Sequence, residues 1–253
     1  MKVAKLLGAV GALVLLACTP VRADGSSWTG LYLGAHAGYG WGDHDVTPIH
    51  PCPTCGNIIA NGGAFTGSAS ASADGWHGGV QIGANYQVGS LVLGIEADIS
   101  GADFSSSQTI RMDYDTDWVS AVNLDMFGTA RVRLGYSTGQ FLIYATGGLA
   151  WARGEMDLDS ISITGPVHMA SMSGDAYHVG WTLGGGFEYA LGSNFSLKAE
   201  YLYVDLGKAD YDPKGAITPD HGGLPAGTPW HELSSTEIDF HTVRIGVNYR
   251  FGG

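Results

Sequence analysis

The chain has 253 residues, of which 24 are acidic, 12 are Lys or Arg and 40 are glycine. Its formal net charge of −12 argues against nucleic acid as a partner, because phosphate backbones bind basic surfaces. The length allows one or two domains. After the N-terminal segment, no apolar run is long enough to span a membrane as a helix.

The first 23 residues are predicted to be a secretory signal peptide. A basic start precedes an apolar stretch, residues 6–18, that is too short to span a bilayer. Cleavage after residues 21–23 would begin the mature domain, residues 24–253, at Asp24. A lipoprotein-type cleavage before Cys18 is the alternative, which Leu16 fits poorly. Removing the signal takes away three basic residues and no acid, so the formal charge of −12 becomes −15.

Eight segments alternate between apolar residues and small or polar residues, which is the period of a β-strand. In chain order they are residues 28–41, 76–87, 91–99, 122–136, 141–151, 177–189, 195–205 and 239–251. Aromatic residues gather at the ends of the apolar faces, as the interfacial girdles of a membrane barrel require. We therefore expect the apolar faces to contact lipid. The soluble alternative is a secreted sandwich or lipocalin-like barrel.

The connections between these segments alternate in length. Short turns follow the second, fourth and sixth segments. The first, third, fifth and seventh are followed by long stretches, residues 43–74, 101–120, 153–176 and 207–237. Short turns at one end and long loops at the other are typical of outer-membrane barrels. The sequence thus predicts an all-β fold, an eight-stranded antiparallel transmembrane β-barrel with short periplasmic turns and four long outer loops.

Four motifs carry a family resemblance. They are Trp28-Thr-Gly-Leu-Tyr-Leu-Gly, Tyr144-Ala-Thr-Gly-Gly-Leu-Ala, Lys198-Ala-Glu-Tyr-Leu-Tyr and Val243-Arg-Ile-Gly-Val-Asn-Tyr-Arg-Phe. The chain resembles the small outer-membrane β-barrel proteins of alphaproteobacteria, described as porin-family or immunogenic surface antigens, and is similar to the OmpA-type transmembrane domain. The resemblance implies a Gram-negative outer-membrane location and insertion by the barrel-assembly machinery, which would read Tyr249 and Phe251. Unlike the family pattern, two glycines follow Phe251.

Charged residues on the polar faces of the segments are expected to point into the lumen. The acids are Glu96, Asp98, Asp125, Glu188 and Glu200, and the bases are Arg131, Arg133, Lys198, Arg244 and Arg250. Because an eight-stranded barrel has room only for side chains, we predict a salt-bridge network that plugs the lumen. The alternative is a narrow polar conduit that these pairs gate.

Two cysteines, Cys52 and Cys55, lie in the first long loop. In an oxidising compartment they are expected to form a disulfide, and a metal site that uses His44 and His50 is the alternative. The nine histidines form no metal-binding motif and are interpreted as ordinary loop and rim residues. Neither a catalytic triad nor a phosphate-binding loop can be identified, so no cofactor and no enzymatic activity are expected.

The expected function is a structural role in envelope integrity together with surface interactions. The alternatives are a small porin for hydrophilic solutes and a surface protein that binds haem or metal through its loops. The expected partners are outer-membrane lipid, lipopolysaccharide, the barrel-assembly machinery and host or envelope surface molecules that the loops contact.

Overall fold

The computed structural model describes residues 27–49, 69–112, 116–162, 168–212, 214–217, 227, 229–231 and 233–251. Its strands are β1 (Gly30–Ile49), β2 (Ala69–Val88), β3 (Leu91–Met112), β4 (Thr116–Ser137), β5 (Phe141–Ser162), β6 (His168–Ala190), β7 (Phe195–Tyr211), β8 (Lys214–Ile217), β9 (Pro229–His231) and β10 (Leu233–Phe251). No helix in this part of the chain is long and apolar enough to cross a membrane.

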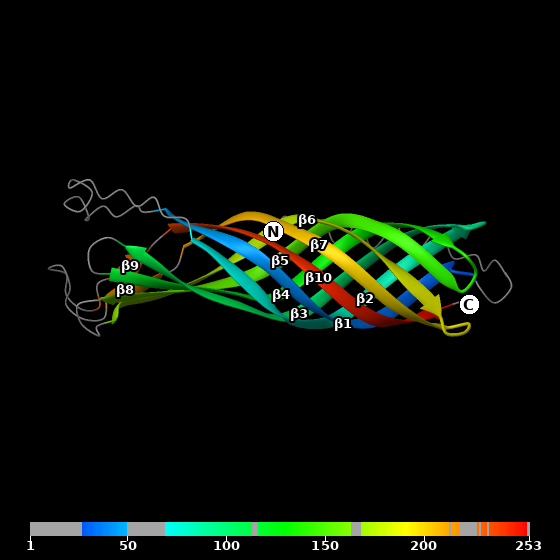
Figure 1. Cartoon of the computed structure of the whole chain (residues 1–253), viewed down its shortest axis with the longest axis horizontal. Coiled ribbons are helices and arrows are strands. Elements are labelled where there is room, and N and C mark those ends of the chain that lie inside the picture. Colours follow the sequence, from blue (N-terminus) through cyan, green and yellow to red (C-terminus); the bar gives the residue numbers. More distant parts are fainter. Residues whose placement is uncertain are drawn as a thin grey trace.

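Eight of these strands form a closed antiparallel ring, which is elongated along its axis (Figure 1). The ring order is β1, β2, β3, β4, β5, β6, β7 and β10, and β10 pairs with β1 to close it. The short strands β8 and β9 continue the sheet from β6 outside the ring. The predicted eight-stranded antiparallel barrel is therefore confirmed.

The three predicted short turns join β2 to β3, β4 to β5 and β6 to β7 at one end of the barrel, which we call the turn end. Gly89 and Gly139 adopt positive φ values of 61° and 83° in two of these turns, which glycine tolerates without strain. Phe251 pairs with Leu31 at the same end. The opposite end, which carries the long connections, is the loop end.

The strands of the ring contain 17 to 23 residues and are longer than predicted. Much of the four predicted loops is strand, and β3 and β4 remain paired out to Met112 and Thr116. The predicted strand ends were wrong because the inner and outer faces of the strands exchange polarity towards the loop end. Near the turn end apolar side chains point outward, whereas near the loop end apolar side chains point inward and acids point outward.

Two β-bulges add a geometric reason for the missed strand ends. The pairing of β4 with β5 shifts register at Asp125, and that of β7 with β10 shifts opposite Ile238. An extra residue in one strand moves every later side chain to the other face. Val122 and Leu124, which were predicted to face outward, are consequently buried inside.

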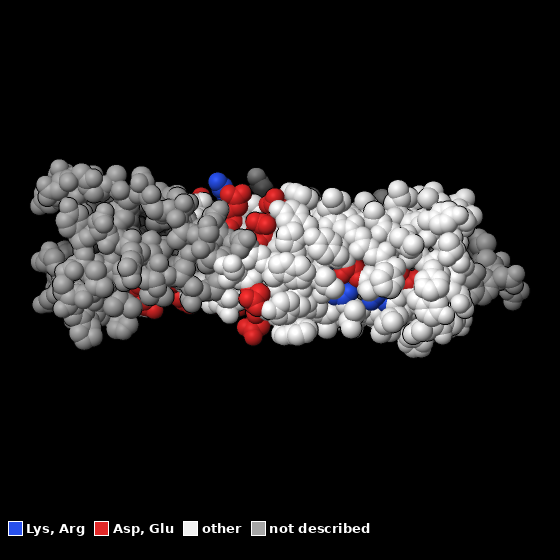
Figure 2. Space-filling model, in the orientation of Figure 1, with Lys and Arg blue, Asp and Glu red and all other residues white. Residues whose placement is uncertain are grey.

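The outer wall carries a belt of mostly uncharged side chains, in which a few charged atoms are visible, and acidic side chains gather beyond it towards the loop end (Figure 2). Exposed aromatic residues border the belt at the turn end, namely Tyr86, Tyr136, Phe141, Phe195, Tyr249 and Phe251. At its other border they are Trp41, Trp76, Tyr177 and Trp181. An apolar belt between two aromatic girdles is the surface of a membrane-spanning β-barrel.

The lumen is filled by three layers of side chains. At the turn end lie Trp28, Val92, Leu142, Tyr144 and Ala190. Buried charged residues occupy the middle. Towards the loop end lies an apolar cluster, which we call the apolar plug: Phe104, Val122, Leu124, Phe127, Ala150, Ala152, Met156, Met172, Ala176, Leu202, Val204, Leu206, Tyr211, Ile238 and Phe240.

Candidate functional site

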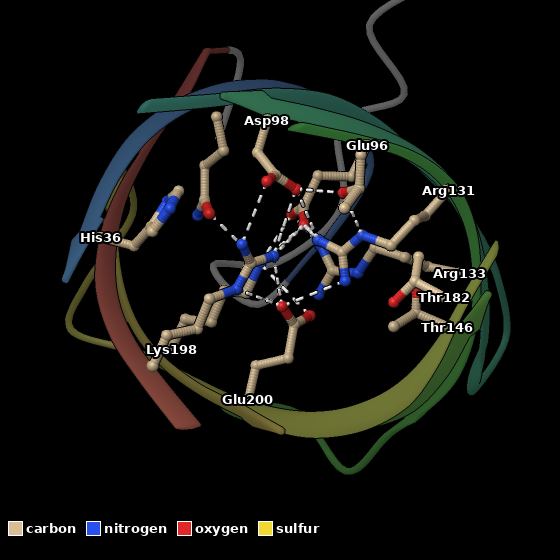
Figure 3. A network of polar contacts seen from close by, with 12 residues as sticks. His36, Glu96, Asp98, Arg131, Arg133, Thr146, Thr182, Lys198 and Glu200 are labelled. Atoms are coloured by element: carbon tan, nitrogen blue, oxygen red, sulfur yellow. Dashed lines mark hydrogen bonds and ion pairs between the residues drawn. The ribbon is translucent and has the colours of Figure 1, made fainter. Parts of the chain in front are cut away.

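Eight of the ten predicted lumenal charges meet in the middle layer (Figure 3). They are Glu96 and Asp98 from β3, Arg131 and Arg133 from β4, Glu188 from β6, Lys198 and Glu200 from β7, and Arg244 from β10. Their side chains are at most 2% exposed. The four acids balance the four bases, so this charge network is formally neutral.

Strand register explains why these residues meet. Glu96 lies directly opposite Arg131, Glu200 opposite Arg244, and Glu188 opposite Lys198. Opposite charges at directly paired positions stabilise neighbouring strands, and all six side chains point inward. The alternation of the sequence therefore carries the information needed to assemble the network.

Glu96 is the centre of the network. Its carboxylate lies 2.7 Å from Lys198 Nζ and 3.5 Å from both Arg133 Nη1 and Arg244 Nη2, and it pairs closely with Arg131 Nη2. Four cations therefore share one carboxylate. Because burial of a lone charge costs several kcal/mol, about 3–5 for a broken buried pair, the cations depend on Glu96 for their compensation.

Asp98 and Glu200 hold the guanidinium group of Arg244 from two sides. Arg244 Nη1 lies 3.2 Å from Asp98 Oδ1, and Arg244 Nη2 lies 2.5 Å from Glu200 Oε2. Thr129 donates its hydroxyl to Asp98 at 2.5 Å, and Arg131 Nη1 lies 3.1 Å from Glu200 Oε2. The carboxylates are thus occupied by partners within the network.

Arg133 extends the network towards the turn end. Its guanidinium carbon lies 3.9 Å from the centre of the Tyr144 ring, and Nη2 contacts Glu188 Oε2 at 2.9 Å. Glu188 also accepts hydrogen bonds from Ser196 and from Asn248, at 2.5 and 2.8 Å. A cation over an aromatic face is a favourable contact that does not need water.

The other two predicted members lie elsewhere. The prediction for Asp125 was wrong, because the bulge in β4 turns this residue to the exposed outer surface. Arg250 is buried but sits at the turn end, 4.7 Å from the Trp28 ring. It donates hydrogen bonds to the carbonyl oxygens of Ser27 and Gly192, at 3.1 and 2.9 Å. Arg250 therefore connects Ser27 to the turn between β6 and β7 instead of pairing with an acid.

Three histidines lie inside the barrel, which sequence reasoning missed. His36 Nε2 lies 2.8 Å from Ser100 Oγ, and His77 Nε2 lies 2.6 Å from Thr242 Oγ1. His178 is also buried. Their interpretation as loop and rim residues was wrong. The available signal was their even spacing with other inward residues of the same strands, which places them on the lumenal face.

A group of phenyl rings covers the network towards the loop end. The ring centres of Phe104 and Phe127 are 6.1 Å apart, and each lies 5.3 Å from that of Phe240. The His77 ring packs against Phe127 with 5.1 Å between centres. These rings separate the charges from the solvent at the loop end.

Several predicted positions are outside the network. Cys52, Cys55 and the signal peptide, residues 1–23, lie outside the described residues. Tyr249 and Phe251 point outward with 40% and 51% of their surface exposed, and their ring centres are 5.0 Å apart. Their use as an insertion signal stays a prediction. Among the described residues, no three His, Cys, Asp or Glu side chains are grouped to hold a metal ion.

The fold and its contents define a class, a membrane-spanning β-barrel whose lumen is filled by paired charges. A family model described as the outer membrane protein beta-barrel domain matches residues 9–251. The chain belongs to this family, and the protein is located in the outer membrane of a Gram-negative cell.

Relatives of known name agree with this family. A 31 kDa outer-membrane immunogenic protein of Brucella melitensis is 35% identical over 92% of this chain and 88% of its own length. A 22 kDa outer membrane protein of Rhizobium leguminosarum is 27% identical over 92% and 82%. The Escherichia coli outer membrane protease OmpT superposes with a TM-score of 0.51 over 92% of this chain and all of its own, at 9% identity. That likeness concerns the fold alone.

Proposed function

We propose that this protein is a structural component of the outer membrane that also presents a surface for interaction, and that it is not a general pore. The observation that carries the proposal is the filled lumen. Eight strands enclose little more than their own side chains, and here those side chains form three successive layers.

An ion that crosses the barrel would have to pass each layer in turn. The phenyl rings of the apolar plug offer no polar partner to a permeating ion. Behind them, every carboxylate of the charge network already contacts at least one cation of the same network. Breaking such pairs leaves buried charges uncompensated, which is costly. This supports a closed barrel over the small-porin alternative.

The outer surface supports the interaction part of the proposal. Beyond the membrane belt, strand residues such as Asp103, Asp157 and Asp175 are exposed, and β5 and β6 remain paired there. We propose that this surface contacts lipopolysaccharide and host or envelope molecules. The immunogenic relatives of Brucella support exposure of such a surface to the outside. Lipid surrounds the belt, and the assembly machinery is proposed to bind the C-terminal strand.

The protein is also proposed to have no enzymatic activity. The buried acids and bases of the charge network satisfy one another, and the side chains are at most 2% exposed. A catalytic group must be able to reach a substrate. The names of the relatives describe location and immunogenicity, which agrees with a role without catalysis.

Folded protein in a planar bilayer is expected to give no reproducible conductance steps, because the apolar plug and the charge network close the lumen. Folding is checked by the heat-modifiable shift on a gel. A variant with Phe104, Phe127 and Phe240 all replaced by Ser is the matched positive control for a weakened plug. Uniform open steps from folded wild-type protein would contradict the proposal and favour a porin.

Cells that lack the protein are expected to become more sensitive to detergent, while their uptake of a small hydrophilic β-lactam stays unchanged. A structural role predicts this pattern because the barrel contributes to the barrier and not to permeation. Detergent survival and antibiotic uptake are measured with and without a plasmid copy. Reduced antibiotic uptake with normal detergent survival is the porin pattern and would count against the structural role.

A further inference from the structure

The barrel wall is incomplete between β6 and β7 near the loop end. These strands pair from Ala190 opposite Ser196 up to Trp181 opposite Asp205, and both strands continue beyond that point. Further along the same edge of β6, pairing resumes only with β8, where Ser173 lies opposite Lys214. Within the described residues, positions 174–180 of β6 and 206–211 of β7 therefore face each other without a ladder. We call this stretch the seam.

A bulge in β7 creates the seam. Gly207 has a positive φ of 62°, and its amide donates to Asp205 Oδ1 at 2.9 Å. Lys208 pairs with Glu237 and Asp205 pairs with Asp239, so two residues of β7, Leu206 and Gly207, lie opposite the single residue Ile238 of β10. A bulge bends its strand and increases the local twist. Here β7 keeps its pairing with β10 and leaves β6.

Two buried side chains, Tyr211 of β7 and His178 of β6, meet on the inner side of the seam. Tyr211 from β7 is fully buried, and its hydroxyl lies 2.8 Å from Nε2 of His178 on β6. The hydroxyl also reaches β5, because a Cβ atom at Gly154 would overlap it. Ala176 lies directly opposite Gly154 and is small and inward-facing. The Tyr211 ring thus occupies a space that small residues on two other strands leave open.

The surroundings of this ring are apolar on the inner side of the wall, whereas the outer edges of the seam carry apolar side chains together with exposed Asp175, Lys208 and Asp210. Inside, Tyr211 belongs to the apolar plug together with Met156 and Met172. Outside, Tyr177 and Val179 on the edge of the seam are 68% and 72% exposed. Both residues lie on β6 beside Trp181, at the border of the membrane belt. Burial raises the pKa of the Tyr211 hydroxyl, with a smaller effect from Asp175, so the phenol remains neutral.

We propose that the space held by the Tyr211 ring is a binding site for a small neutral phenol-like molecule, which enters sideways through the seam while Tyr211 swings out. An uncharged aromatic ring fits the apolar lining, and His178 offers a hydrogen-bond partner to one hydroxyl. Opening the seam breaks no strand pairing among the described residues, but it separates the His178 ring from the Gly207 backbone, which it contacts across the seam. The ligand gains the burial and the hydrogen bond that the Tyr211 side chain loses. These two contributions to the free energy of exchanging the side chain for the ligand therefore cancel.

The probe is 4-methylphenol, which has the structure of a tyrosine side chain. The full protein in lipid nanodiscs, with ¹³C-labelled methionine methyl groups, is titrated and followed by NMR. Met156 and Met172 report on the apolar plug. We expect saturable shifts of these two signals in the wild type, weaker binding of toluene, which lacks the hydroxyl, and none of benzoate, because an anion would lose its hydration.

Variants locate the site. Tyr211→Ala empties the space and is expected to bind 4-methylphenol at least about tenfold more tightly, since no side chain competes. Tyr211→Phe keeps the ring, removes its bond to His178 and is expected to bind about fivefold more tightly, so it serves if the alanine variant does not fold. Tyr203→Ala, an outward tyrosine of the same strand, is the matched control and should bind like the wild type.

Three outcomes would overturn the inference. Absence of saturable shifts in all proteins removes the site. Binding by the Tyr211 variants but not by the wild type means that Tyr211 does not move aside. Equal binding by the wild type and both variants places the ligand elsewhere. The conductance expected under the proposed function is unaffected by each of these results, so the two ideas fail separately.

Discussion

Replacement of Glu96 by Gln is expected to lower the free energy of unfolding by about 3–5 kcal/mol, the range for breaking a buried ion pair. The amide keeps the size of the side chain but removes the charge that faces Arg131, Arg133, Lys198 and Arg244. Four buried cations would then share the three remaining acids of the network. Their desolvation would no longer be compensated.

The measurement is urea unfolding of the protein in lipid vesicles, followed by tryptophan fluorescence. Asp125→Asn is the matched control, because this acid was predicted from the sequence to join the network but lies exposed outside the barrel. Its expected effect is within about 0.5 kcal/mol, as for other surface changes. Equal losses for the two variants would show that Glu96 does not organise the lumen.

Replacement of Phe127 by Ala is expected to cost about 3–5 kcal/mol, because the removed ring leaves a cavity in a packed interior. Phe127 is fully buried and contacts the rings of Phe104, Phe240 and His77. The loss should appear as an earlier midpoint in the same urea titration with an unchanged slope.

Phe187→Ala is the control for this second change, since Phe187 is 54% exposed on the membrane belt and leaves no internal cavity. We expect it to lose less than half as much stability as the buried variant. If both variants lose the same amount, lipid contact and not internal packing would account for the effect of Phe127, and the apolar plug would be a weaker seal than its geometry indicates.

Much of this fold could be predicted from alternation alone. The number of strands in the ring, the three short turns and eight of the ten lumenal charges all follow from a period of two. Inward residues such as Glu96 and Arg131 were identifiable because their outward neighbours are apolar. The pattern is readable wherever one face meets lipid and the other meets a polar interior.

The same pattern becomes unreadable towards the loop end. There the wall meets water outside and an apolar plug inside, so residues such as Phe104 and Asp103 exchange the expected polarity. The extra residues at Asp125 and Gly207 then shift the alternation of β4 and β7, and among 40 glycines in the sequence Gly207 alone does not identify a bulge. The contact of Tyr211 with His178 depends on that shift, so it required the three-dimensional structure.

The distribution of lumenal charges among strands bears on the order in which the barrel can be inserted. Glu96 and Asp98 on β3 are matched by Arg131 and Arg133 on β4, so the lumenal charges of this hairpin cancel without help from other strands. An uncompensated charge in the hydrocarbon region costs several kcal/mol, about 2.5 or more. This hairpin can therefore enter the bilayer before its neighbours.

The lumenal charges of β6, β7 and β10 do not cancel in the same way within one hairpin. On β7, Lys198 lies 3.4 Å from Glu200 and balances it, but Glu188 on β6 and Arg244 on β10 are each unmatched within their own strand. Arg250 on β10 lies at the turn end, outside the network. The charge network becomes neutral only when β10 pairs with β7 and β1. Electrostatics thus favours a route in which the C-terminal strand completes the barrel and commits it to the membrane.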